Sequence, residues 1–305
     1  MPRPDVIALF GPTAVGKTAL ALALAEQLRD LGEDPVAVSA DALQVYSGLE
    51  TLTGAPTPDE QAQLEHRLIS LIDVDQTFSA GQYAQLAHSE IDGLLVTGRR
   101  PIVLGGTGLY LRAALTELSL KPPPPPGVRE RWTAELERQG PQALHVLLGQ
   151  RAPEVASRIE PGDRQRVLRA LELLEVGEST QPEAESELWT DSVRHPTLLI
   201  GLVMERAALY ERIDRRVDEM VAAGATEEVR AAAGVGASAT AAKALGFAEL
   251  LRGDTDAMKR RTRRYARRQL TWMRKLSGVS VVDVTQRAPD DVAAEVLELW
   301  LREPE

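Results

Sequence analysis

The sequence contains no cysteine in its 305 residues. This absence excludes disulfide bonds, thiolate metal ligands and thiol catalysis, and it is typical of proteins that work in a reducing cytoplasm. No apolar run reaches membrane-spanning length, and no signal peptide precedes the first apolar stretch at residues 6–10. We therefore expect a cytoplasmic protein without a membrane partner.

Internal repeats and metal-ligand spacings such as His-x-x-x-His are also missing from the sequence. The formal net charge is −10, which argues against indiscriminate binding of polyanions. The charges are unevenly distributed along the chain, however, so a nucleic-acid partner stays open. Hydrophobic residues make up 44% of the chain, which is ample for one large domain or two smaller ones.

The segment Gly11-Pro12-Thr13-Ala14-Val15-Gly16-Lys17-Thr18 fits the phosphate-binding pattern G-x-x-x-x-G-K-[ST]. It lies between an apolar stretch that suits a buried strand, residues 6–10, and a segment rich in Ala and Leu that favours a helix, residues 19–29. The glycines let backbone N–H groups point into one concavity, Lys17 adds a positive charge, and the Thr18 hydroxyl suits Mg²⁺ on a phosphate. The pattern predicts a di- or triphosphate ligand bound by Gly11, Thr13, Ala14, Val15, Gly16, Lys17 and Thr18.

A second strand is expected over residues 35–39, and Asp41 follows it. In open parallel sheets, ligands bind beyond the carboxyl ends of the strands, so Asp41 is placed to face the content of the phosphate loop. Asp is also a frequent helix N-cap at such junctions. Position alone leaves both interpretations open.

A further strand at residues 101–104 leads into a second glycine-rich turn, Gly105-Gly106-Thr107-Gly108. The backbone there can approach an anion, and Thr107 carries a hydroxyl donor. The alternative is a tight turn between strand and helix without a ligand.

Five successive prolines, residues 122–126, indicate a stiff connector into an inserted domain. Residues 128–177 have helical character, and Asp163 is a candidate cap for a helix that presents Arg166 and Arg169 on one face. That face is either a solvated surface or a contact to phosphates. A strand at residues 197–203 returns to the first sheet, so we expect a core over residues 1–116 and 197–305, with the helical insertion over residues 117–196.

The last long helix carries nine basic residues between Lys259 and Lys275 and no acidic one, with Tyr265 and Trp272 interleaved. A solvated face usually mixes charge signs, so this helix indicates a nucleic-acid surface. An earlier helix, residues 206–221, mixes its arginines with acidic residues, which favours ion pairing within that helix.

Taken together, these motifs resemble the tRNA dimethylallyltransferase (tRNA isopentenyltransferase) family over nearly the whole chain. Only the phosphate loop is generic, whereas the combination in this order is specific. The matching segments are residues 11–18, Ala40-Asp41-Ala42-Leu43-Gln44-Val45-Tyr46, Phe78-Ser79, Gly105-Gly106-Thr107-Gly108-Leu109-Tyr110, Asp163-Arg164-Gln165-Arg166, Leu209-Tyr210-Glu211-Arg212-Ile213-Asp214-Arg215-Arg216, and Arg268-Gln269-Leu270-Thr271-Trp272.

The resemblance implies an α/β fold: a P-loop NTPase-like core with a mostly parallel sheet flanked by helices, and an inserted all-helical domain that contacts tRNA. It implies transfer of a dimethylallyl group from dimethylallyl diphosphate to the exocyclic amine (N6) of the adenosine 3′ of the anticodon, with release of diphosphate. The tRNA anticodon stem-loop and dimethylallyl diphosphate are then the partners, and Mg²⁺ is the cofactor. We expect the protein to act as a monomer.

For the site, the resemblance implies Asp41 as the general base, Thr107 as a residue that assists catalysis and Arg216 as a contact to the diphosphate. Thr18 would contact the metal. The residues that match tRNA-contacting segments of the family are Asp41, Ala42, Leu43, Gln44, Gln165, Arg166, Val167, Leu168, Arg169, Lys243, Gly246, Phe247, Arg267, Arg268, Trp272 and Arg274.

The implied chemistry agrees with the residue types. An aryl amine is a poor nucleophile, and diphosphate leaves readily once its charge is neutralised by a lysine, an arginine, backbone amides and Mg²⁺. A carboxylate can accept the proton of the amine, and the amide of Gln44 suits an adenine edge. This chain departs from the usual family residues at Val15, Ala42, Leu43, Ala55, Phe247 and Ala248.

Two other classes of protein use a phosphate loop. A small-molecule kinase or NTPase would need a site for an adenine nucleotide. An RNA-binding GTPase-like module would need a guanine-recognition motif N-K-x-D, which the sequence lacks.

Overall fold

The computed structural model describes residues 3–118, 120–121, 123–178, 190 and 192–302. The chain divides into two compact units. The core unit comprises residues 1–119 and 188–305, and the helical unit comprises residues 120–187. No helix among the described residues combines the length and apolar character needed to cross a membrane.

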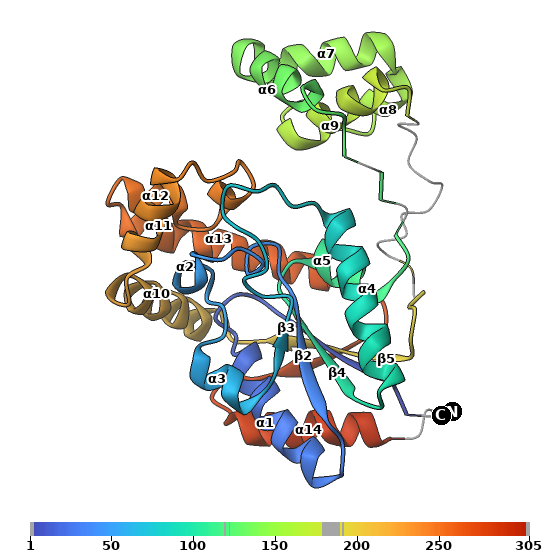
Figure 1. Cartoon of the computed structure of the whole chain (residues 1–305), viewed down its shortest axis with the longest axis vertical. Helices are drawn as coiled ribbons and strands as arrows, with labels where there is room; N and C mark the ends of the chain where they lie inside the picture. The colour runs from blue at the N-terminus through green and yellow to red at the C-terminus, as the bar shows by residue number, and fades with distance from the viewer. Residues whose placement is uncertain (1–2, 119, 122, 179–189, 191, 303–305) are drawn as a thin grey trace. The chain divides into compact units, whose positions relative to one another are not determined.

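The core unit alternates strands and helices along its first half (Figure 1). This half contains β1 (Val6–Phe10), α1 (Lys17–Asp30), β2 (Pro35–Ala40), α2 (Glu50–Thr53), α3 (Pro58–Gln63), β3 (His66–Arg67), α4 (Ala80–Val96), β4 (Arg100–Gly105) and α5 (Gly108–Leu115). Its second half contains β5 (Thr197–Val203), α10 (Arg206–Ala222), α11 (Ala225–Gly234), η2 (Ala241–Lys243), α12 (Phe247–Leu251), α13 (Thr255–Met273), β6 (Val279–Asp283) and α14 (Pro289–Leu301).

The six strands form one sheet in the order β3-β2-β4-β1-β5-β6, and every pairing in it is parallel. The predicted α/β fold with a mostly parallel sheet is therefore confirmed. The strands expected at residues 6–10, 35–39, 101–104 and 197–203 are β1, β2, β4 and β5.

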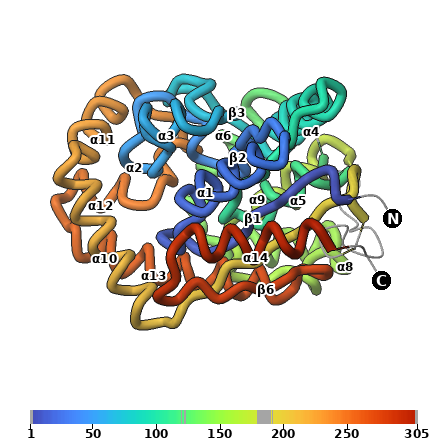
Figure 2. The backbone as a smooth tube through the Cα atoms, turned by 90° about the horizontal axis from the view of Figure 1, so that it is seen from below, coloured from blue at the N-terminus to red at the C-terminus, as the bar shows by residue number. Residues whose placement is uncertain are grey.

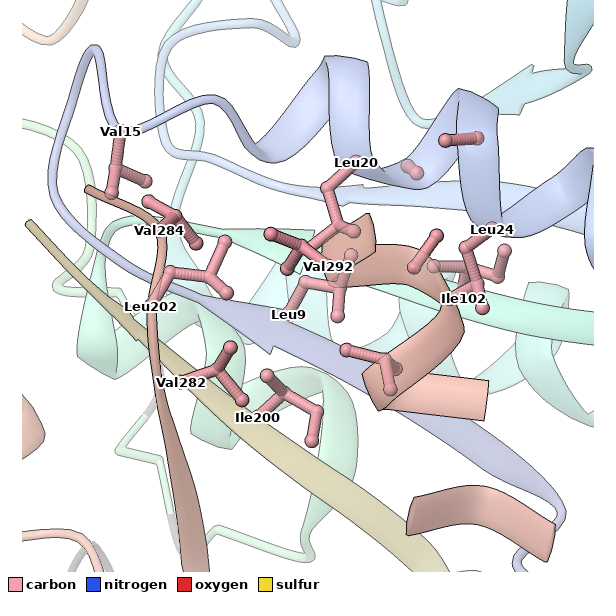
Figure 3. Close-up of a cluster of buried hydrophobic side chains, with 14 of the residues drawn as sticks. Leu9, Val15, Leu20, Leu24, Ile102, Ile200, Leu202, Val282, Val284 and Val292 are labelled. Carbon is pink, nitrogen blue, oxygen red and sulfur yellow. The ribbon is translucent and has the colours of Figure 1, made fainter. Parts of the chain in front are cut away.

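Both faces of the sheet are buried, as parallel sheets require. Leu9 of β1 and Ile200 and Leu202 of β5 point toward Leu20 of α1 and Val292 of α14, which cover one face (Figure 3). Burying each such side chain contributes roughly 1.5–3 kcal/mol. The alternation of side chains along each strand leaves the neighbouring residues for the other face.

Helices α4 and α5 pack on the opposite side of β2 and β4. The hydroxyl of buried Tyr83 in α4 donates a hydrogen bond to the Ser39 carbonyl of β2 at 2.9 Å. A capping box opens α4, because Ser79 and Gln82 bond each other's backbone N–H groups. Near the chain ends, the Trp300 indole donates to the Pro4 carbonyl at 2.9 Å, so α14 lies beside the strand that opens the chain (Figure 2).

Three loops that matter for function start side by side. The last residues of β1, β2 and β4 are register neighbours, because Gly105 pairs with both Phe10 and Ala40. The Gly11 N–H also donates to the Gly105 carbonyl at 3.3 Å. The phosphate loop, the Asp41 segment and the second glycine-rich turn therefore meet at one edge of the sheet.

The helical unit contains α6 (Val128–Gln139), α7 (Pro141–Arg151), α8 (Pro153–Ala156) and α9 (Arg164–Glu175), and no strand among its described residues. Its core is built around Trp132, Leu144, Leu148 and Leu171. Asp163 caps α9 as predicted, since its carboxylate accepts from the Arg166 N–H at 3.1 Å. In the proline run, residue 122 lies outside the described residues, and residues 123–126 form neither helix nor strand.

Candidate active site and nucleic-acid surface

The phosphate-binding loop, residues 11–18, connects β1 to α1. Ala14 and Gly16 adopt left-handed backbone angles, with φ of 65° and 107°. This conformation is natural for glycine and uncommon for alanine, and in such loops it turns successive N–H groups toward one concavity. The side chains of Ala14 and Val15 are buried in the core, so these two residues can offer a ligand only their backbone.

Lys17 closes the loop with its own side chain. The Nζ group donates to the Gly11 carbonyl at 3.0 Å and to the Pro12 carbonyl at 3.1 Å. The pKa of Lys17 is lowered to about 8, mainly by burial and in part by the positive charge of Arg216, and the negative charge of Asp41 opposes this shift. The two predicted catalytic residues Asp41 and Arg216 therefore lie within electrostatic reach of the Lys17 ammonium.

A metal at this loop would depend on the phosphate oxygens of a ligand. The Thr18 hydroxyl makes no hydrogen bond to any residue that the structure describes, so it is available as a ligand. Clusters of three or more His, Cys, Asp or Glu side chains that could hold a metal are absent from the described ranges. This donor set fits Mg²⁺ bound to a phosphate, since Mg²⁺ commonly combines one or two protein ligands with phosphate oxygens and water.

Two arginines of α10 approach the loop region. Arg216 donates to the Gly54 carbonyl at 3.4 Å, and a Cβ built on Gly54 would lie 1.9 Å from its Nη2 atom, so the close approach requires glycine. One turn earlier, Nη2 of Arg212 lies 3.3 Å from the position of a Cβ on Gly16. Burial lowers the pKa of both guanidinium groups. Arg212 was not assigned to the site from the sequence, although its spacing of four from Arg216 puts both residues on one helix face.

Asp41 is not a helix N-cap, because no helix begins after it before α2 at Glu50. Its Oδ1 atom instead accepts a hydrogen bond from the Leu43 N–H at 2.9 Å, which fixes the carboxylate by a local turn. The N-cap alternative considered from the sequence is therefore wrong. The carboxylate faces the cations Lys17 and Arg216, whose pKa values its charge raises.

Gln44 has both ends of its amide engaged within the protein. Its Oε1 atom accepts from the Ser39 hydroxyl at 2.7 Å, and its Nε2 atom donates to the Gly54 carbonyl at 3.1 Å. Contact with an adenine edge would have to replace one of these bonds. The neighbouring Ala42 and Leu43 are partly exposed, as expected for a surface that receives a substrate.

Thr107 follows β4 directly, and its hydroxyl lies 2.9 Å from the hydroxyl of Tyr265 on α13. Burial raises the pKa of Tyr265 to about 12, with a further contribution from the negative charge of Asp41. Burial and the same carboxylate also raise the pKa of Tyr83 and of Tyr110, so Asp41 lies among three phenol groups.

Gln269 of α13 links the two glycine-rich loops and was missed as a site residue. Its Oε1 atom accepts from the Thr13 N–H at 2.9 Å, and its Nε2 atom donates to the Gly106 carbonyl at 2.8 Å. The phosphate-binding pattern predicts Thr13 as a diphosphate contact, but its backbone N–H already donates to Gln269 within the protein. A sequence signal existed, because Gln269 belongs to the segment Arg268-Gln269-Leu270-Thr271-Trp272 through which the chain resembles the family.

Trp272 packs edge-on against the second glycine-rich turn. A Cβ on Gly108 would lie 1.9 Å from the indole ring, so only glycine fits there. The Arg268 guanidinium lies 5.6 Å from the ring centre of Tyr265. The predicted RNA contacts Arg268 and Trp272 are therefore close to Thr107. Arg267 is exposed on the outer side of α13, and Arg274 is exposed at the C-terminal end of this helix.

The outer side of α13 forms a cationic groove with α10. The groove has a volume of about 290 Å³ and is lined by Arg206, Tyr210, Arg260, Arg263, Arg264 and Arg267. Arg263 is held by both carboxylate oxygens of Asp214. Arg264 and Arg267 are exposed and have no ion-pair partner among the described residues.

Acidic residues neutralise part of α13, which the sequence of the helix alone did not indicate. Lys259 pairs with Asp218 of α10 at 2.6 Å, and Arg261 pairs with Glu249 at 3.0 Å. The acidic residues of α10 thus pair mostly with α13, and the expected pairing within α10 is seen between Arg215 and Glu219 at 3.7 Å.

The predicted RNA contacts on α9 divide by burial. The side chains of Val167 and Leu168 belong to the core of the helical unit, whereas Gln165 and Arg166 are exposed. Arg169 bonds the fully buried carboxylate of Glu172 at 3.1 Å. Side-chain contacts of α9 to a ligand therefore fall mainly to its first turn.

The segment around η2 and α12 is similarly divided. Lys243 is exposed, whereas Gly246 and Phe247 are buried. Gly246 has φ of 96°, and a Cβ there would lie 2.6 Å from the end of the Met258 side chain. Gly246 and Phe247 therefore shape this segment, and Lys243 is the member that presents a charge.

The sequence matches the family model described as IPP transferase over residues 44–276. The tRNA dimethylallyltransferase of Thermobifida fusca is 42% identical, with 88% of this chain and 87% of the relative covered. The tRNA dimethylallyltransferase of Streptomyces coelicolor is 41% identical, with 90% of this chain and 88% of the relative covered.

Solved structures agree with these matches. The crystal structure of the full-length tRNA isopentenylpyrophosphate transferase from Bacillus halodurans is similar with a TM-score of 0.69 and 32% identity, covering 97% of this chain and 95% of that one. A eukaryotic dimethylallyltransferase acting on tRNA shares the fold, with a TM-score of 0.73, 23% identity and coverage of 96% and 77%. On the length and level of these matches, the chain belongs to the IPP transferase family, as its motifs predicted.

Proposed function

We propose that this protein transfers a dimethylallyl group from dimethylallyl diphosphate to N6 of the adenosine 3′ of a tRNA anticodon. The N6 nitrogen forms a bond to C1 of the dimethylallyl group while the bond between C1 and the diphosphate oxygen breaks. Diphosphate leaves with that electron pair, and the amine loses one proton. The observation that carries the proposal is the placement of a carboxylate, Asp41, beside the cations of a phosphate-binding loop.

The leaving diphosphate would be bound by the backbone amides of the loop and by Lys17, with Arg216 and Arg212 as further cations. The three cations are partly or wholly buried, so their interaction with a negative charge is little screened by water. Stabilising the charge that develops on a leaving group is usually the largest contribution to such a reaction. Mg²⁺ held by the phosphates and the Thr18 hydroxyl would neutralise part of the same charge.

Asp41 would accept the proton of the N6 amine. Its Oδ1 atom is fixed by the Leu43 N–H, and this leaves the carboxylate able to receive the proton. The Thr107 hydroxyl, oriented by Tyr265, would bind the reacting groups from the next strand end. An adenosine must leave its stack to reach these residues, because they lie at the end of a buried sheet.

The cationic groove between α10 and α13 would bind the RNA backbone. Arg264 and Arg267 offer charges that no acidic residue of the described chain neutralises, and Arg206 is steadied by its bond to the Tyr210 hydroxyl at 3.2 Å. Arginine suits phosphate because its planar fork can donate two parallel hydrogen bonds. Gln165 and Arg166 of the helical unit and Lys243 would add contacts. We expect the active species to be a monomer.

The test follows release of diphosphate by the purified protein with Mg²⁺ and dimethylallyl diphosphate. One diphosphate should appear for each tRNA, and none should appear with a tRNA whose nucleotide 3′ of the anticodon is a pyrimidine. Stoichiometric hydrolysis of ATP without any dependence on dimethylallyl diphosphate would instead favour the kinase class. Sedimentation of the protein with and without tRNA would decide whether the active species is a monomer.

A further inference from the structure

The buried face of α13 contacts both glycine-rich loops of the core unit. Gln269 is only 5% exposed, and its two hydrogen bonds reach the Thr13 N–H and the Gly106 carbonyl, 256 and 163 residues away in the sequence. A Cβ on Gly106 would lie 2.4 Å from Nε2 of Gln269, so the amide fits closely against this loop. Gln269 therefore bonds both loops, which also touch directly through the hydrogen bond from the Gly11 N–H to the Gly105 carbonyl at 3.3 Å.

Side chains on the neighbouring turns of α13 also contact the second glycine-rich turn. Tyr265 and Trp272 lie four residues before and three residues after Gln269, so all three side chains share one face of the helix. Tyr265 bonds Thr107, and Trp272 packs on Gly108 at the start of α5, which lies beside α13 (Figure 1). The arginines that α13 contributes to the cationic groove lie on the opposite face of this helix, and they are Arg260, Arg263, Arg264 and Arg267.

We propose that Gln269 is a positioning residue that fixes the phosphate-binding loop relative to the Thr107 loop. This inference rests on the proposed function, because it assigns the leaving-group contacts to one loop and the Thr107 hydroxyl to the other. Gln269 itself contacts no substrate in this arrangement. It keeps the Thr13 amide in place, so that the remaining amides of the loop face the diphosphate while Thr107 stays in register with the reacting carbon.

The chemistry of the side chain explains why glutamine serves here. One amide supplies an acceptor for the Thr13 N–H and a donor for the Gly106 carbonyl. Glutamate of the same length keeps the acceptor and loses the donor. Methionine keeps the approximate volume and loses both, which leaves the buried Gly106 carbonyl and the Thr13 N–H without partners.

The experiment compares Gln269→Met and Gln269→Glu with a matched control, Gln27→Met. Gln27, in the last turn of α1, donates one exposed hydrogen bond, to the Asp290 carbonyl at 3.1 Å, and this bond involves neither loop. Each variant is tested for binding of inorganic diphosphate with Mg²⁺, for tRNA affinity, and for the single-turnover rate of transfer at saturating substrates.

Gln269→Met should weaken diphosphate binding at least tenfold and slow the saturated turnover at least tenfold, while tRNA affinity stays within threefold of wild type. Gln269→Glu should bind diphosphate at least as weakly as Gln269→Met, because its carboxylate opposes the Gly106 carbonyl and repels the anion, and Gln27→Met should match wild type. Turnover and diphosphate binding within threefold of wild type in Gln269→Met would overturn the inference. If Gln269→Met does not fold, Gln269→Glu decides by the same two criteria.

Failure of the proposed function would look different. If the wild-type protein transfers no dimethylallyl group, the proposed function is refuted. The diphosphate measurement alone then decides whether Gln269 positions the phosphate-binding loop, because it needs neither tRNA nor transfer.

Discussion

Binding of diphosphate should weaken as the pH rises above about 8, because the ligand needs Lys17 in its charged form. Burial lowers the pKa of this ammonium from 10.5 to about 8 in the ligand-free protein. The difference corresponds to roughly 3 kcal/mol, at 1.36 kcal/mol for each pKa unit, as the cost of burying the charged ammonium. A bound diphosphate places negative charge beside Nζ and raises the pKa again, so binding above pH 8 must take up a proton.

The magnitude follows from this linkage. Below pH 8 most molecules already carry the charged form, and above it the association constant should fall by about one power of ten for each pH unit until the pKa of the complex is reached. Between pH 7 and pH 9 the expected loss is about tenfold. The assay is calorimetric titration with inorganic diphosphate and Mg²⁺ across this range.

Lys17→Met provides the control, because diphosphate has its own titration and methionine has none. The ratio of wild-type to variant association constants isolates the contribution of Lys17. A ratio that is constant from pH 7 to pH 9 would refute the reasoning. Folding stability without diphosphate depends on pH in the opposite direction, because the Lys17 amine binds its proton more tightly in the unfolded chain than in the folded protein. Lys17 therefore lowers the free energy of unfolding at pH 7, and this cost disappears as the pH rises from about 8 to 10.5.

Three further changes test separate parts of the account. Asp41→Asn should slow the chemical step by roughly 10²–10⁴, the usual scale for general-base catalysis, and leave Mg²⁺-dependent diphosphate binding within a few-fold; loss of binding in step with rate would make Asp41 a metal-organising residue. Replacing Arg264 and Arg267 by Gln should lower the slope of log tRNA affinity against log salt by roughly 2, whereas an unchanged slope would identify the groove as a solvated surface. Glu172→Gln should destabilise the helical unit by about 1–2 kcal/mol, since it weakens charge-assisted hydrogen bonds from the partly exposed Arg129 and Arg169, and thermal unfolding measures this. Burial opposes the ionisation of Glu172, but bonds from Arg129 and Arg169 hold its pKa below the ordinary value. The carboxylate therefore stabilises the fold above the unfolded pKa near 4.5, and this stabilisation is lost as the pH falls through the lower folded pKa. Acid unfolding that is identical in wild type and Glu172→Gln would contradict this role.

The features that the sequence predicted correctly depend on local signals. The order of strand, glycine-rich loop and helix around Gly11 to Thr18 and the Asp163 cap each need only a few neighbouring residues, and each is present. The parallel sheet followed from short apolar strands alternating with helices. The short β6 and α14 were not predicted.

Features that depend on tertiary contacts could not be predicted in this way. The bond between Gln269 and Thr13 joins residues that are 256 positions apart in the sequence. The pairing of Arg263 with Asp214 of another helix neutralises part of the positive charge of α13. Asp41 illustrates the limit of position as evidence. The strand end placed it beside the phosphate loop, but only the structure shows that no helix begins before Glu50 and that Asp41 caps a local turn through the Leu43 N–H.

The central claim is transfer of a dimethylallyl group to one adenosine of tRNA, and nucleoside analysis of the product tests it most directly. Purified protein is incubated with Mg²⁺, dimethylallyl diphosphate and unmodified tRNA, the RNA is digested, and the nucleosides are identified by mass spectrometry. We predict N6-dimethylallyladenosine from the position 3′ of the anticodon, formed by the wild type and reduced at least 10²-fold with Lys17→Ala, the scale of losing one leaving-group contact. Unchanged adenosine at that position with active, folded protein, or equal product with Lys17→Ala, would contradict the account.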